Sequence, residues 1–142
     1  MNFLLDTNVV SEWVKPRPNA NVVRWLAKID EDRVFLSVIT FAEIRLGVEE
    51  MVAGWRRDGL RRWLQIELPA RFEGRILGVD LAVAEGWGDL MARGSKIGLN
   101  LSVMDAFFAA TAGAHGLTLV TRNTKHFERL GASLINPWLE RR

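Results

Sequence analysis

Three acidic side chains are spaced so that they could share one site. Asp6 directly follows the apolar run Phe3–Leu5, whereas Glu43 and Asp105 each fall in the first turn of a predicted helix. In a parallel sheet, the ends of the strands and the starts of the helices that follow them meet at one edge, where ligands bind. A carboxylate at the end of a buried strand is costly to desolvate without a partner. We therefore expect the three acids to converge on a cation.

The side chains available in this chain favour a hard metal ion. The sequence of 142 residues has no cysteine and two histidines, and the histidines do not have the spacing of a zinc site. A site made of carboxylate oxygens suits Mg²⁺ or Mn²⁺. The chain carries neither a GxxxxGK[ST] loop nor a GxGxxG loop, so ATP and NAD are disfavoured as ligands.

Helix capping is the competing explanation for each acid. Thr40 and Glu43, like Ser102 and Asp105, have the spacing of a capping box, in which the acid bonds back to the start of its own helix. Asp6 could be a plain N-cap. The two roles do not exclude each other, so both stay open from the pattern alone.

The elements that must position these acids alternate along the chain. Apolar runs predict strands at 3–5, 34–38, 75–79, 117–120 and 134–135. Periodicity and end signals predict helices at 7–14, 19–29, from 40 onward, within 55–69, at 81–91 and at 102–116. Because parallel neighbours need crossover connections, this order predicts an α/β fold with a mainly parallel sheet and helices on both faces. We expect a single domain over residues 1–142.

The composition indicates a compact protein with a real core. Hydrophobic residues make up 49% of the chain, and the formal net charge is +2, which permits a nucleic-acid partner without requiring one. The lack of cysteine fits a reducing cytoplasm. No apolar stretch is long enough to cross a bilayer, so we expect no membrane association.

One strongly basic segment, WRRDGLRRW, runs from Trp55 to Trp63. Its four arginines are expected to form a solvated helix face while the two tryptophans pack inward. A surface that meets RNA or a protein partner is the alternative.

Four segments taken together resemble a known family. FLLDTNVVSE, SVITFAEIRLG, LSVMDAFFAATA and LVTRNTKHFERLG…LINPW are similar to the PIN domain of VapC-type toxins, close to the FitB-like branch, over nearly the whole chain. The resemblance implies a three-layer α/β/α sandwich and a metal-dependent endoribonuclease. It makes Asp6, Glu43 and Asp105 the catalytic acids and the ligands of Mg²⁺ or Mn²⁺, with Asp6 and Asp105 as the direct ligands.

The same resemblance assigns further residues around the acids. Thr7, Asn8 and Thr121 are candidates to hydrogen-bond the acids or the attacking water. Asn123 stands where many relatives carry a fourth acid, so it could act as a neutral oxygen donor or as a support. Candidate contacts to RNA or a partner are Arg45, Arg122, Lys125 and His126.

The family resemblance also implies partners and a reaction. The chain is expected to be the toxin of a type II toxin–antitoxin system, a homodimer neutralised by a VapB-type antitoxin, with operator DNA bound only through the antitoxin. Mg²⁺ would activate a water for in-line attack on an RNA phosphodiester and stabilise the leaving oxygen.

Two other functions compete with this one. A PIN-like module could bind RNA or protein without cutting, with its acids acting only as helix caps. An aspartyl-phosphate phosphotransferase also places an aspartate after its first strand and uses Mg²⁺. The sequence disfavours the phosphotransferase, because Asp6-Thr7-Asn8 lacks a second aspartate two residues on.

Overall fold

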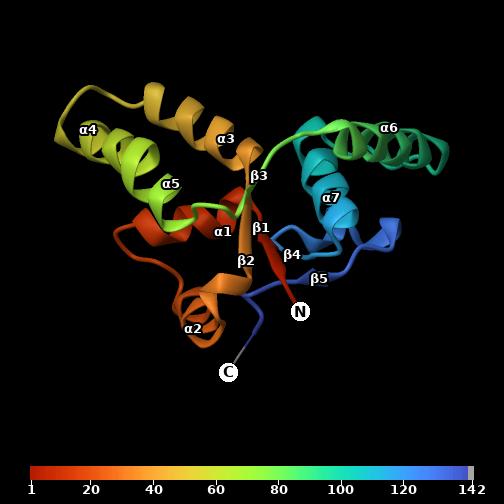
Figure 1. Cartoon of the computed structure of the whole chain (residues 1–142), viewed down its shortest axis with the longest axis horizontal. Coiled ribbons are helices and arrows are strands. Elements are labelled where there is room, and N and C mark those ends of the chain that lie inside the picture. The colour runs from red at the N-terminus through yellow and green to blue at the C-terminus, as the bar shows by residue number, and fades with distance from the viewer. Residues whose placement is uncertain (141–142) are drawn as a thin grey trace.

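The computed structural model describes residues 1–140 and is built around a five-stranded sheet (Figure 1). The strands are β1 (Phe3–Leu5), β2 (Val34–Ser37), β3 (Ile76–Leu77), β4 (Thr118–Val120) and β5 (Leu134–Ile135). Their order is β3-β2-β1-β4-β5, and every pairing is parallel. The strand order therefore reverses between β1 and β4. This arrangement confirms the predicted α/β fold and puts the expected ligand-binding edge at the carboxyl ends of β1 and β4.

Helices cover both faces of the sheet, as Figure 1 shows. One layer consists of α1 (Thr7–Val10), α2 (Ala20–Lys28), α3 (Val38–Glu49), α4 (Trp55–Arg62) and α5 (Leu68–Arg71). The other consists of α6 (Leu81–Lys96) and α7 (Val103–His115), which pack against each other. The predicted three-layer sandwich is thus confirmed. Within residues 1–140, no helix is long and apolar enough to span a membrane.

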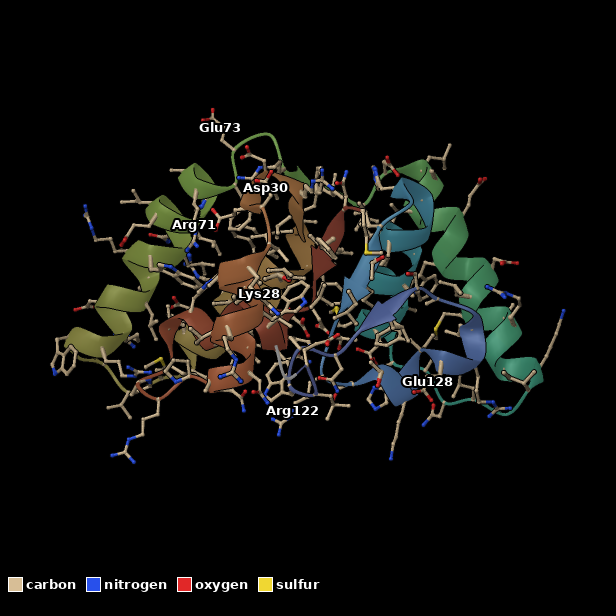
Figure 2. All side chains as sticks on the ribbon, turned by 90° about the horizontal axis from the view of Figure 1, so that it is seen from below. Lys28, Asp30, Arg71, Glu73, Arg122 and Glu128 are labelled. Atoms are coloured by element: carbon tan, nitrogen blue, oxygen red, sulfur yellow. The ribbon has the colours of Figure 1, made fainter. Side chains whose placement is uncertain are left out.

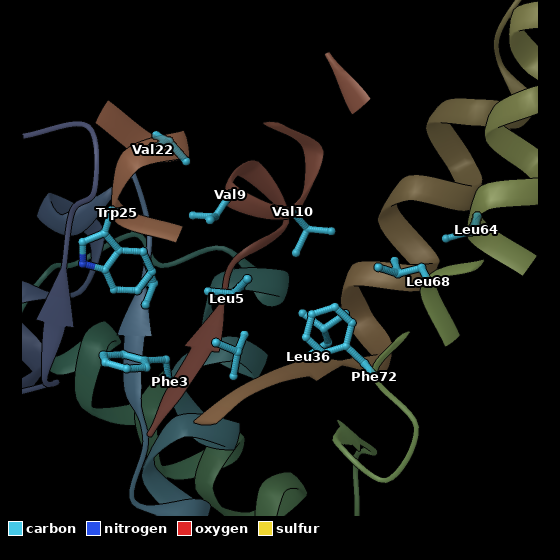
Figure 3. Close-up of a cluster of buried hydrophobic side chains, with 12 residues drawn as sticks. Phe3, Leu5, Val9, Val10, Val22, Trp25, Leu36, Leu64, Leu68 and Phe72 are labelled. Atoms are coloured by element: carbon cyan, nitrogen blue, oxygen red, sulfur yellow. The ribbon is translucent and has the colours of Figure 1, made fainter. Parts of the chain in front are cut away.

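The central strand β1 is buried on both of its faces. Phe3 and Leu5 belong to the core cluster that packs against α1, α2 and α5 and includes Phe72 (Figure 3). Leu4 points the opposite way, into the cluster that contains Phe108 of α7. This alternation is the period of two that a strand imposes, and here both sides meet helices. The end of β1 is therefore a rigid support for the residue that follows it.

The start of α3 differs from the prediction. β2 stops at Ser37, whose hydroxyl accepts the Ile39 N–H at 3.0 Å and caps the helix. Val38 is therefore the first helical residue rather than the last residue of a strand. Thr40 lies inside the first turn of α3 and is not its cap, so the capping-box interpretation of Thr40 and Glu43 was wrong.

The basic segment forms a helix that passes through Pro69. α4 continues into a π-helical segment, Trp63–Glu67, and then into α5, which ends at Arg71. The prediction that this helix ends near Pro69 was therefore short by two residues. A proline has no N–H to donate, and the hydrogen-bond pattern widens just before it. α6 is also longer than predicted, because it continues to Lys96 rather than stopping near residue 91.

Candidate active site

Asp6 lies where the strand order reverses, between the ends of β1 and β4. Its backbone N–H donates to the Val120 carbonyl at 2.9 Å, which extends the β1–β4 pairing by one residue. The Asp6 side chain is the N-cap of α1 and accepts the Thr7 N–H at Oδ1 at 2.6 Å. Thr121, the residue after β4, donates its hydroxyl to Asp6 Oδ2 at 2.8 Å. Both carboxylate oxygens are therefore held in place, Oδ1 from the start of α1 and Oδ2 from the end of the neighbouring strand β4.

Burial changes the acidity of this carboxyl. Asp6 is 5% exposed, and burial raises its pKa to about 6, although hydrogen bonds from Thr121 and Thr7 oppose the rise. Repulsion by the charges of Asp105 and Glu43 makes a smaller contribution to the same rise. These two carboxylates therefore lie near enough for their charges to act on Asp6.

Glu43 reaches the site from the second turn of α3. Its Oε1 accepts the hydroxyl of Thr7 at 2.6 Å. The Thr7 hydroxyl lies 3.1 Å from the hydroxyl of Thr40, which is fully buried. Thr7 therefore joins two of the acids, because its N–H holds Asp6 and its hydroxyl holds Glu43. The sequence did not predict that Thr40 takes part in these hydrogen bonds, because the Thr-x-x-Glu spacing was interpreted as a cap.

Asp105 reaches the site from the first turn of α7. The Ser102 hydroxyl accepts the Asp105 N–H at 3.1 Å, so half of the predicted capping box is present. The Asp105 carboxylate bonds elsewhere: its Oδ2 lies 2.8 Å from Nδ1 of His126. His126 was predicted only as a contact to RNA or a partner. The signal for the pairing was its position in the loop after β4, at the same edge of the sheet.

The remaining predicted support residues lie in the turn after β4 and at the start of α1. Asn8 Nδ2 is 3.5 Å from Asp6 Oδ2, and Asn8 Oδ1 accepts the Arg122 N–H at 3.3 Å. Asn123 is exposed and donates its backbone N–H to the Thr121 hydroxyl at 3.0 Å. Asn123 thus contributes to the site through its backbone, which orients the hydroxyl that holds Asp6.

The predicted basic contacts are spread around the rim. Arg122 points outward at the edge of the molecule (Figure 2), and its guanidinium lies 5.3 Å from the centre of the Trp138 ring. Lys125 is exposed. Arg45 forms an ion pair with Glu49 at 3.2 Å on its own helix. Arg122 and Lys125 therefore lie exposed on the loop after β4 that also carries His126, whereas Arg45 is paired along its own helix.

The basic segment in α4 is also resolved in detail. Arg61 forms a two-point ion pair with Glu49 of α3, at 2.6 and 2.8 Å. Trp63 packs against the core, as predicted. Trp55 does not pack inward, because it is 85% exposed at the start of α4, so that part of the prediction was wrong.

The donor set can be tested for its fit to a metal ion. Among residues 1–140, no three His, Cys, Asp or Glu side chains form a ready-made metal-binding group. Zinc needs three or four protein ligands, and the site does not supply them. Mg²⁺ takes one or two carboxylates and keeps several waters, so the oxygen donors of Asp6 and Asp105 suit it. The burial of the Asp6 carboxylate, to which the charges of Asp105 and Glu43 add repulsion, is the observation that favours a cation here.

Comparison with known proteins agrees with this architecture. The family described as "PIN domain" matches residues 3–132. Plasmid stability protein StbB of Pseudomonas syringae pv. tomato is 42% identical, over 96% of this chain and 98% of its own. VapC ribonuclease Y4jK of Sinorhizobium fredii is 40% identical, over 96% of this chain and 97% of its own.

Solved structures give the same result. The crystal structure of FitAcB from Neisseria gonorrhoeae superposes with a TM-score of 0.91 at 39% identity, over 96% of this chain and 99% of that one. A structure of FitAB bound to an IR36 DNA fragment superposes with a TM-score of 0.92 at 36% identity, over 99% and 98% of the two chains. With this sheet order, this edge of acids and these relatives, the chain belongs to the PIN domain family.

Proposed function

We propose that this chain is the endoribonuclease toxin of a toxin–antitoxin pair and cuts RNA at the edge formed by Asp6, Glu43 and Asp105. The observation that supports the proposal is the buried Asp6 carboxylate beside the reversal of strand order, which is linked to Glu43 through Thr7 and whose pKa burial raises to about 6. The relative Y4jK is named a VapC ribonuclease.

Asp6 and Asp105 would hold a divalent ion, Mg²⁺ or Mn²⁺, with Glu43 as the third acid. Bound there, the ion would lower the pKa of a water and offset the negative charge of the phosphodiester. Thr7 and Thr121 fix both oxygens of Asp6, so its carboxylate is oriented before any ligand arrives. The Thr7 hydroxyl fixes Oε1 of Glu43, which leaves Oε2 of that residue for a ligand or a water proton.

The rim of the site would bind the rest of the RNA. Arg122 and Lys125 lie on the loop after β4 that also carries His126, and cations at this place can contact phosphates. Phosphate contacts of this kind orient a substrate without reading its sequence, so they fit a cleavage site whose specificity arises elsewhere.

The partners follow from the relatives. FitAB, which resembles this chain closely, was solved bound to DNA. We propose that a VapB-type antitoxin covers the acidic edge of this chain, that the toxin forms a homodimer, and that operator DNA is bound through the antitoxin.

The deciding experiment is RNA cleavage by the purified chain with Mg²⁺, with Mn²⁺ or with EDTA. We expect metal-dependent cleavage that Asp105→Asn reduces by at least about a hundredfold, because an amide is a poor Mg²⁺ ligand. Asp89→Asn is the matched control, since Asp89 is an exposed carboxylate on α6 that is paired with Arg93 at 3.3 Å. Equal cleavage in EDTA, or by Asp105→Asn, would overturn the proposal. Metal binding without cleavage would favour the non-catalytic RNA- or protein-binding module.

A further inference from the structure

We propose that Thr40 is a positioning residue whose buried hydroxyl holds Glu43 in place for the metal, acting through Thr7. The inference rests on the proposed function and adds to it a residue that touches neither the metal nor the RNA. It replaces the capping role that the Thr-x-x-Glu spacing predicted.

Two hydrogen bonds link Thr40 to Glu43, both on α3, through the hydroxyl of Thr7 on α1. The hydroxyl oxygens of Thr40 and Thr7 are 3.1 Å apart, and the Thr7 hydroxyl donates to Glu43 Oε1 at 2.6 Å. Thr40 and Glu43 are three residues apart on α3, so they lie on the same face of the helix and can share Thr7 as a partner. Thr40 is completely buried, whereas Glu43 is only half-buried. Thr40 is therefore held firmly in the core, and the position of Glu43 depends on it through Thr7.

The direction of the hydrogen bonds follows from the number of protons. An ionised carboxylate can only accept, and a threonine hydroxyl has one proton to give. Because Thr7 gives its proton to Glu43, the Thr40 hydroxyl must be the donor to Thr7. Thr40 thus fixes the rotation of the Thr7 hydroxyl. Without that donor, the Thr7 oxygen would be left with an unsatisfied acceptor in a part-buried position.

Thr7 is also the residue that couples Glu43 to Asp6. Its backbone N–H donates to Asp6 Oδ1 at 2.6 Å while its hydroxyl serves Glu43. Loss of the Thr40 donor would therefore loosen Glu43, while Asp6 stays held by the Thr7 backbone N–H and the Thr121 hydroxyl. The expected effect is weaker metal binding without loss of the fold.

Two substitutions separate the hydroxyl from the packing. Thr40→Val keeps the branched shape and removes the donor, whereas Thr40→Ser keeps the donor and removes a buried methyl group. The probe is Mn²⁺ alone, bound to the full-length chain and measured by the electron paramagnetic resonance signal of free Mn²⁺. We expect Thr40→Val to weaken Mn²⁺ binding about tenfold and Thr40→Ser to stay within about twofold of wild type. Thermal unfolding should show the opposite order, with Thr40→Ser the less stable.

Thr111→Val is the matched control. Thr111 is a fully buried threonine of α7 whose hydroxyl donates to the Phe107 carbonyl of its own helix at 2.7 Å. This substitution should leave Mn²⁺ binding unchanged. Cleavage gives a second measurement: the rate of Thr40→Val should be low at limiting Mn²⁺ and recover at high Mn²⁺, which a general structural defect would not do.

The outcomes separate the two proposals. If wild type binds Mn²⁺ no better than Asp105→Asn, the metal site fails and this inference fails with it. If wild type binds Mn²⁺ and Thr40→Val binds it equally well, the role of Thr40 alone is refuted. If Thr40→Val does not fold, Thr40→Ala replaces it in the same comparison with Thr40→Ser.

Discussion

Replacing Asp6 with asparagine tests whether a buried carboxylate destabilises the metal-free fold. Burial, helped by the charges of Asp105 and Glu43, raises the Asp6 pKa from 3.8 to about 6. The folded chain therefore binds a proton at Asp6 more tightly than the unfolded chain does, so stability falls as the pH rises between these two values. The destabilisation is fully present above about pH 6 and absent below about pH 3.8.

The size of the effect follows from the two pKa values. The difference between 3.8 and about 6 corresponds to about 3 kcal/mol of unfavourable free energy when Asp6 is ionised in the folded state. Asparagine still caps a helix well and still offers a carbonyl oxygen, but it carries no charge. The stability of Asp6→Asn relative to wild type should therefore rise by about 2 kcal/mol between about pH 4 and about pH 7.5.

Urea unfolding in EDTA, followed by the fluorescence of buried tryptophans such as Trp25, measures this difference. Taking the difference between two proteins cancels the titration of the acids that do not interact with Asp6. Asp89→Asn is the control, because it makes the same carboxylate-to-amide change at an exposed position. If the difference in the free energy of unfolding between wild type and Asp6→Asn does not change with pH, the raised pKa of Asp6 is refuted. At the upper pH, Mg²⁺ should stabilise wild type and not Asp6→Asn.

Two further predictions concern the rim and the core. His126→Ala should weaken Mn²⁺ binding about tenfold, because Nδ1 no longer holds Asp105. His126→Asn keeps a donor near that position and should therefore bind Mn²⁺ more tightly than His126→Ala. Equal Mn²⁺ binding by the two variants would argue against this role of His126. Leu68→Ala should lower the free energy of unfolding by about 2–5 kcal/mol, since Leu68 is fully buried. Ile66→Ala, two residues away at a 53% exposed position, should change it by less than about 1 kcal/mol. Chemical denaturation of both would contradict the core assignment if their losses were similar.

Much of the architecture could be predicted from local sequence patterns, because strands and helical connections alternate along the chain. β1 illustrates this, since three apolar residues followed at once by a polar acid mark both a strand buried on two faces and its end. The place of Asp6 at the edge where the strand order reverses was likewise predictable, because parallel strands deliver their ends to one edge, whereas the convergence of all three acids stays a prediction.

The contacts that the sequence did not predict are made between residues far apart along the chain. Thr40 and Glu43 match a capping box by spacing, but the cap is Ser37, and the partner of Thr40 is Thr7, which is 33 residues away in the sequence. The pairing of His126 with Asp105 similarly needs the loop after β4 to fold against α7. The passage of a helix through Pro69 depends on a change in hydrogen-bond pattern that proline alone does not predict.

The magnitudes also decide between capping and metal binding for Asp6. As an N-cap, aspartate contributes about 1 kcal/mol, and asparagine or serine would contribute about the same without a charge. The burial of this carboxylate costs about 3 kcal/mol once it is ionised. α1 has four residues, so its dipole recovers little of that cost. An uncharged cap would therefore give a more stable metal-free protein, and a cation bound at position 6, as we propose, would offset the cost of the carboxylate there.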